Sequence, residues 1–157
     1  MKPRKLRGPW DGGYALDIHT VSSTFLGYDG AGNARYDTIY SPVGELLYRL
    51  KSRNDLTAVP PLVDAIEAFW KISPRPRIDL IVPAPPSKTR KYQPVILVAT
   101  ALSERLKVPL CTGCLSKVKK TCQLKDVLEH DKRMEALRDA FAVSPEPDGR
   151  ERYSAVR

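Results

Sequence analysis

Ile78-Asp79-Leu80-Ile81-Val82 leads directly into Pro83-Ala84-Pro85-Pro86. The first segment is short, apolar and β-branched, which is typical of a strand covered on both faces of a parallel sheet. The prolines fix φ and remove amide donors, so they end the strand. Apolar residues at helical spacing then predict a helix from about Gln93 to Lys107, and Pro109–Val118 is expected to contain another strand. This order predicts a βαβ unit with a right-handed crossover and an α/β fold built on a parallel sheet.

Upstream of this unit, the sequence predicts an antiparallel β-hairpin followed by helices. The β-forming residues of Tyr14–Tyr28 precede turn-forming glycine and asparagine in Asp29–Asn33, and Tyr36–Tyr40 supplies the returning strand. Ser41-Pro42 offers a capping hydroxyl followed by proline at the first helical position, so a helix is expected to begin there. The remaining expected elements are a helix over Pro61–Lys71, a helix over 128–138 and a strand over Ala140–Val143.

The length of 157 residues predicts one domain. We expect a loose basic arm over 1–13, the domain itself over 14–143, and a disordered, proline-rich tail over 144–157. No apolar run approaches the roughly 20 residues of a membrane helix, and no apolar segment follows the charged N-terminus. Three cysteines argue against a disulfide framework and for a reducing compartment. The sequence thus predicts a cytoplasmic protein without a membrane partner.

The positive charge is concentrated in one quarter of the sequence. The net charge is +8, and nine basic residues but only Glu104 among acidic ones fall between Lys88 and Lys125. The rest of the chain carries 17 basic and 17 acidic residues. A local field of this sign favours an anionic ligand, although a solvated basic face is the alternative interpretation.

Two segments carry candidate ligand-binding groups. In the loop after Val82, backbone amides together with the charges of Lys88 and Arg90 and the start of the next helix favour a bound phosphate. A rigid turn with solvated bases is the alternative. The segment Ser116–Lys125 is too basic for a core strand and is typical either of a mobile segment that closes over a phosphate ligand or of a surface hairpin.

In their order and spacing these segments resemble the ComF-like phosphoribosyltransferases over roughly residues 14–143. The resemblance implies a type I phosphoribosyltransferase fold, a parallel α/β sheet with a hood, which binds phosphoribosyl pyrophosphate together with magnesium. The matching pieces are Gly44–Lys51, Asp79–Pro85 with Arg90 and Gln93, Lys119–Leu124, Arg133, and Ala140-Phe141.

The same resemblance implies roles for individual residues. The loop after the first core strand of such proteins holds pyrophosphate, and a mobile catalytic loop corresponds here to Lys117–Gln123. No metal-ligating residue is implied, because magnesium enters with the ligand. The implied pyrophosphate-binding residues are Ala84, Ser87, Lys88 and Arg90, and the implied catalytic residues are Lys119, Lys120, Thr121 and Gln123.

The sequence also departs from the family pattern. The family's acidic pair and glycine-rich loop should follow Gly149-Arg150, where this chain reads Glu151-Arg152-Tyr153-Ser154-Ala155-Val156-Arg157. Without them the chain lacks the groups that bind the ribose hydroxyls and the 5′-phosphate, so we expect a truncated core and inefficient phosphoribosyl transfer. The family's N-terminal zinc module is absent as well, and the loop after Pro85 has an atypical sequence.

Two other interpretations stay open. A DNA-binding accessory protein of competence, the process of DNA uptake, would also use a basic cluster, but the sequence shows no helix-turn-helix, zinc-finger or RNA-binding signature. Cys111, Cys114, Cys122 and His130 together supply the ligand types of a zinc site, but their spacing favours a plain strand carrying small thiols. The oligomeric state is left undetermined.

Overall fold

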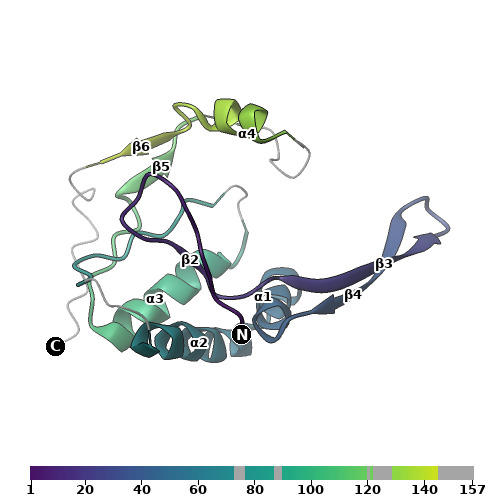
Figure 1. Cartoon of the computed structure of the whole chain (residues 1–157), viewed down its shortest axis with the longest axis horizontal. Coiled ribbons are helices and arrows are strands. Elements are labelled where there is room, and N and C mark those ends of the chain that lie inside the picture. Colours follow the sequence, from purple (N-terminus) through teal and green to yellow (C-terminus); the bar gives the residue numbers. More distant parts are fainter. Residues whose placement is uncertain (73–76, 87–89, 120, 122–128, 145–157) are drawn as a thin grey trace. The chain divides into compact units, whose positions relative to one another are not determined.

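Figure 1 shows a computed structural model of the protein, which describes residues 1–72, 77–86, 90–119, 121 and 129–144. The chain divides into two compact units, Met1–Pro76 and Arg77–Arg157. Each sheet in the described ranges consists of two antiparallel strands. Within those same ranges, no helix combines the length and the apolar character needed to cross a membrane.

The strands of the first unit form two antiparallel pairs. β1 (Arg4–Lys5) pairs with β2 (Tyr14–Ala15), and β3 (Thr20–Tyr28) pairs with β4 (Ala34–Tyr40). The second pair is the hairpin that the sequence predicts. Its turn is held by the Asp29 carboxylate, which accepts hydrogen bonds from backbone amides two and four residues later, at 2.9 and 2.8 Å.

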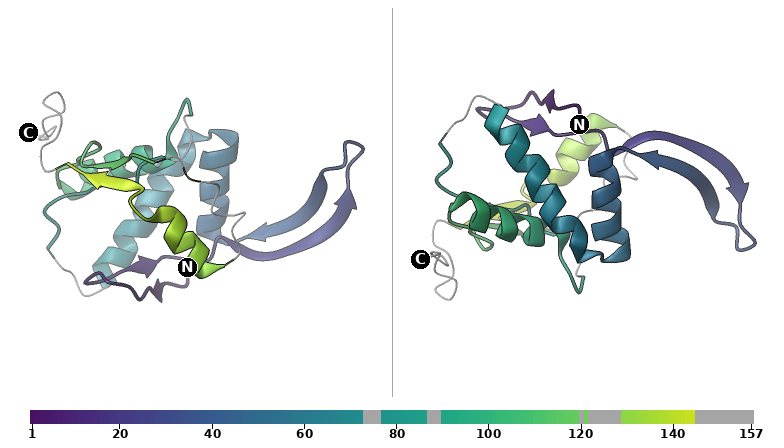
Figure 2. Two further views of the ribbon diagram at one scale, coloured as in Figure 1. Left: turned by 90° about the horizontal axis from the view of Figure 1, so that it is seen from above. Right: turned by 90° about the horizontal axis from the view of Figure 1, so that it is seen from below.

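Two helices carry the core of this unit. α1 (Pro42–Arg53) begins as predicted, because the Ser41 hydroxyl accepts a 3.0 Å hydrogen bond from the Gly44 amide. The short 3-10 helix η1 (Leu56–Ala58) leads into α2 (Val59–Ile72), which lies beside α1 (Figure 2). The buried apolar residues of these helices are Leu50, Ala58, Leu62, Val63 and Phe69.

The second unit contains α3 (Pro94–Leu106), β5 (Leu115–Lys117), α4 (His130–Leu137) and β6 (Phe141–Val143). β5 and β6 form an antiparallel pair in which Leu115 lies opposite Val143. Ala140, which precedes β6, is completely buried. The predicted helices over 93–107 and 128–138 and the predicted last strand are therefore present, with bounds that differ by a few residues.

The prediction of a parallel-sheet α/β core is wrong. The segment from Ile78 to Val82 forms no strand; only Ile81 makes an isolated parallel bridge, with Leu110. Leu80 and Val82 stay 37% and 41% exposed. A parallel strand is stable when both of its faces are covered, and the face that carries Leu80 and Val82 is not, so the apolar composition of this segment does not lead to a sheet.

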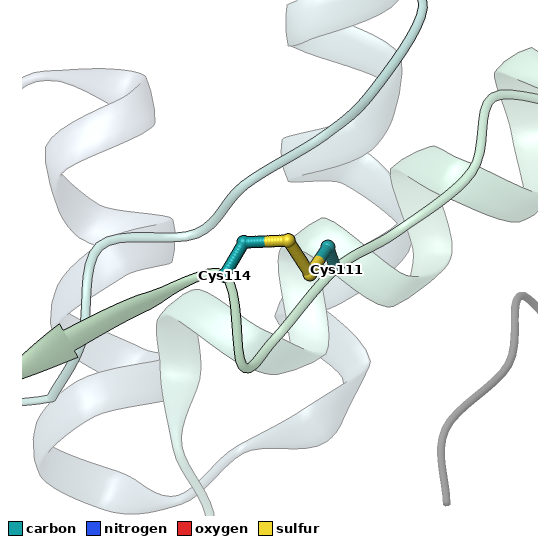
Figure 3. Close-up of a disulfide and its surroundings, with 2 residues drawn as sticks. All are labelled: Cys111 and Cys114. Atoms are coloured by element: carbon teal, nitrogen blue, oxygen red, sulfur yellow. A yellow bond between two sulfur atoms is a disulfide. The ribbon is translucent and has the colours of Figure 1, made fainter. Parts of the chain in front are cut away.

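The expectation for the cysteines is also corrected. Cys111 and Cys114 form a disulfide across a turn and do not lie in a strand (Figure 3). Their sulfur atoms are bonded to each other and are therefore not available as zinc ligands in this structure. The third cysteine, Cys122, lies outside the described residues.

Candidate anion site

The loop that follows Ile81 is anchored at its start. The Ile81 amide donates to the Pro109 carbonyl at 2.8 Å, and the Ile81 carbonyl accepts from the Cys111 amide at 2.9 Å. Pro83 is buried, whereas Ala84 next to it is exposed. The proline ring fixes φ at Pro83, at the start of the loop.

The loop ends at the N-terminus of α3. Gln93 is the N-cap residue, and in the described part of the chain its side chain makes no capping hydrogen bond. Pro94 has no amide hydrogen, and the Leu97 amide bonds to the Gln93 carbonyl at 3.0 Å. The amides of Val95 and Ile96 come before this bond and have no acceptor within the helix, so the positive end of α3 follows the loop.

The end of α3 returns the chain to the bridge at Ile81. Lys107 adopts a left-handed conformation with φ 55°, and its amide donates to the Ser103 carbonyl. The Ser103 hydroxyl donates to the Val108 carbonyl at 2.6 Å. These bonds end the helix at Leu106, three residues before Pro109, so α3 connects the two sides of the parallel bridge.

Exposed cations follow the loop. Arg90 and Lys91 are both exposed, and the Lys91 ammonium lies 5.3 Å from the centre of the Tyr92 ring. Ala84 and Arg90 are thus the two predicted pyrophosphate-binding residues that the structure describes. The other two, Ser87 and Lys88, lie outside the described residues.

The predicted catalytic segment begins on β5. The half-buried Lys117 donates from Nζ to the Thr121 hydroxyl at 2.7 Å, and the Val118 amide donates to the Ala140 carbonyl at 3.0 Å. Lys119 is exposed. The structure thus brings Thr121 to Lys117, a residue of the same segment. Lys120 and Gln123, also predicted as catalytic, fall outside the described ranges.

Sequence reasoning missed the pairing of Cys111 with Cys114. The Cys-x-x-Cys spacing occurs in redox-active disulfides, which normally lie at a helix N-terminus, but this segment was predicted to be a strand. In the described ranges, no three His, Cys, Asp or Glu side chains come together as a metal site.

Comparison with known proteins does not assign the chain. Neither the protein-family models, nor the curated proteins, nor the solved structures contain a match to it.

Proposed function

We propose that the Arg77–Arg157 unit binds an anion with two linked phosphates, either inorganic pyrophosphate or the pyrophosphate group of a phosphorylated sugar. The binding groups are the backbone and cations of the loop between Ile81 and α3, together with the basic segment that begins on β5. The proposal concerns binding and does not extend to group transfer. It includes the cytoplasmic location predicted from the sequence.

The observation that carries this proposal is the position of the charge surplus. Nine basic residues and one acidic residue fall between Lys88 and Lys125, and this stretch includes the end of the anchored loop, all of α3 and β5. Among these cations, Arg90, Lys91 and Lys119 are exposed. Exposed cations close to helix amides attract a phosphate more strongly than either group does alone.

The backbone supports the same interpretation. The chain passes from the bridge residue Ile81 through the loop into the N-terminus of α3, and returns to the bridge at Leu110. The positive end of a helix attracts anions to the loop that precedes it.

The experiment is a titration of the full chain with pyrophosphate, with and without magnesium, followed by calorimetry and by thermal unfolding. A ligand at 100 times its dissociation constant stabilises the folded state by about 2.7 kcal/mol, so the melting temperature should rise. Arg90→Gln should weaken binding by about 10- to 100-fold, because a hydrogen bond from a charged group contributes about 1.5–3 kcal/mol.

The matched control is Arg35→Gln, which removes the same charge from an exposed position on β4 of the other unit. Its affinity for pyrophosphate should equal that of the natural chain. Equal losses in both variants, or no binding at millimolar pyrophosphate, would overturn the proposal. Tighter binding to single-stranded DNA than to pyrophosphate, with a steep dependence on salt, would favour the nucleic-acid alternative.

A further inference from the structure

We infer that Cys111 and Cys114 form a reversible thiol–disulfide exchange site whose oxidation state controls anion binding by the same unit. The control of anion binding rests on the function proposed above. The exchange itself does not, and it can be tested separately.

The two cysteines belong to two different sets of backbone hydrogen bonds. The Cys111 amide donates to the Ile81 carbonyl at 2.9 Å, next to the loop of the candidate anion site. The Cys114 carbonyl accepts from the Ser144 amide at 2.9 Å, at the end of the β5–β6 pair. The disulfide therefore fixes the turn that joins the parallel bridge to the basic strand β5 (Figure 3).

The disulfide closes a very small ring. The two cysteines are three positions apart, and their Cα atoms are separated by 5.6 Å. The restriction that a disulfide places on the unfolded chain grows with the length of the loop it closes, so this bond contributes little by that route. Its main effect is local, on the shape of the turn, and a local constraint is suited to a switch.

The two cysteine residues differ in exposure. Cys111 is 5% exposed, whereas Cys114 is half-buried and follows the exposed residue Gly113. A Cβ built on Gly113 meets no atom within 4 Å, so the side of the turn before Cys114 is open. An external thiolate should therefore attack the Cys114 sulfur, because exchange requires access to the sulfur that is attacked.

The exchange proceeds with low-molecular-weight thiols of the glutathione class. The external thiolate bonds to the Cys114 sulfur, the bond between the two cysteines breaks, and Cys111 leaves as a thiolate that takes a proton. A second external thiolate then attacks the mixed disulfide and releases the Cys114 thiolate, which is protonated in turn. One protein disulfide is reduced to two thiols, and two external thiols are oxidised to one disulfide.

The consequence for the anion site follows from the position of β5. Lys117 on β5 donates to the Thr121 hydroxyl, and Lys119 comes two residues later. When the disulfide is reduced, the turn between Cys111 and Cys114 keeps its hydrogen bonds to Ile81 and Ser144 but loses its covalent constraint, so the cations after β5 are held less firmly relative to the loop after Ile81. We therefore expect weaker binding of pyrophosphate by the dithiol form.

The first test is a redox titration of the full chain carrying Cys122→Ser, so that the pair supplies every thiol. The chain is equilibrated with mixtures of reduced and oxidised glutathione, alkylated, and weighed by mass spectrometry. We expect a transition from two alkylated thiols to none. The variant Cys122→Ser with Cys114→Ser should keep an alkylatable thiol or a glutathione adduct. A pair that does not change state across the glutathione range would overturn the exchange site.

The second test measures pyrophosphate affinity in the two oxidation states. Reduction should weaken binding by at least about fivefold, the lower end of typical coupling between sites. The double substitution Cys111→Ser with Cys114→Ser should bind like the reduced chain and should not respond to reductant. Equal affinities in both states would overturn the control of binding. A pair that titrates in a chain that never binds pyrophosphate would remove the proposed function and leave the exchange site standing.

Discussion

Gly44 is buried in α1, where the helix passes close to the backbone before β3. A Cβ at this position would collide with the carbonyl oxygen of His19. Gly44→Ala should therefore lower the free energy of unfolding by about 1–3 kcal/mol, because backbone has to move to make space. Both tryptophans, Trp10 and Trp70, lie in this unit, so tryptophan fluorescence during urea unfolding measures the loss.

The matched control for Gly44 is Gly30, in the hairpin turn. A Cβ on Gly30 meets nothing within 4 Å, and Gly30 is not among the residues with positive φ. Gly30→Ala should change stability by less than about 0.5 kcal/mol. If the Gly44→Ala variant unfolds at the same urea concentration as the natural chain, the close approach to the His19 carbonyl does not exclude a side chain at this position.

Ser41 is a second residue whose contribution can be measured. It is 3% exposed, and its hydroxyl accepts the Gly44 amide hydrogen bond that begins α1. Ser41→Ala should lower the free energy of unfolding by about 1 kcal/mol, whereas Ser41→Thr keeps a hydroxyl group and should retain most of the stabilisation that the cap provides. The comparison is Ser52→Ala, at an exposed position of the same helix, which should be nearly neutral. A cap that contributed nothing would leave all three variants alike.

The Asp55 carboxylate gives a pH dependence. Hydrogen bonds from the Thr57 hydroxyl, and then from Arg49, hold the pKa of Asp55 below its ordinary value. A carboxyl whose pKa is lowered on folding stabilises the fold above its unfolded pKa of about 4, and this stabilisation disappears as pH falls through the lower native pKa. Asp55→Asn should therefore be less stable than the natural chain at pH 7.

The measurement for Asp55 is urea unfolding of both proteins from pH 7 down to pH 2. The difference in unfolding free energy should be constant above about pH 5 and should shrink as the pH falls. A difference that stayed the same down to pH 2 would mean that the carboxylate charge is not what Thr57 and Arg49 stabilise.

At the scale of elements, the stability of the outer part of the β3–β4 hairpin, away from α1, depends on contacts between its own side chains. Tyr40 stacks on Tyr48 of α1 with ring centres 4.8 Å apart. Farther out, Phe25 contacts Tyr28 and Tyr36 at 5.3 and 5.5 Å, yet all three rings stay largely exposed. Figure 1 shows these strands as a long two-stranded ribbon, a structure that is only marginally stable alone.

Phe25→Ala should loosen the outer half of this hairpin. Aromatic pairs contribute about 0.5–1.5 kcal/mol, so hydrogen exchange of the Tyr36 amide should accelerate by about three- to tenfold. Amides of α1 should keep their protection, since the Tyr40–Tyr48 stack is unchanged. Thr24→Ala is the comparison, because Thr24 pairs with Asp37 and not with an aromatic residue. Equal acceleration in both variants would contradict a role for the ring contacts.

At the scale of the whole molecule, charge is distributed unevenly along the chain. Lys119 belongs to the stretch that holds the entire positive surplus, whereas Arg7 belongs to the balanced remainder. Lys119→Gln should weaken pyrophosphate binding by about two- to tenfold and flatten its dependence on sodium chloride between 50 and 500 mM. Arg7→Gln, measured by the same calorimetric titrations, should alter neither quantity. If the two variants lose affinity equally, only the net charge matters and not its location.

Elements with local signals were predictable. Ser41-Pro42 carries both parts of a helix start, and the Asp29–Asn33 turn carries its own hydrogen-bond acceptor, so α1 and the hairpin were confirmed. Part of the candidate site could also be predicted from the sequence, because the prolines and the basic residues identify the loop that contains Ala84 and Arg90. Their binding roles stay predictions, as do those of Lys119 and Thr121.

The sequence alone determined the helices, the hairpin and the location of the positive charge, because each of these depends on residues within a few positions of one another. Tertiary structure alone decided that Ile81 pairs with Leu110 in one bridge rather than in a sheet, that Gly44 meets His19, and that Cys111 bonds to Cys114. The physical reason is that these pairings depend on how segments are packed against one another in the folded chain. Local patterns of polarity and of helix or strand propensity do not specify this packing.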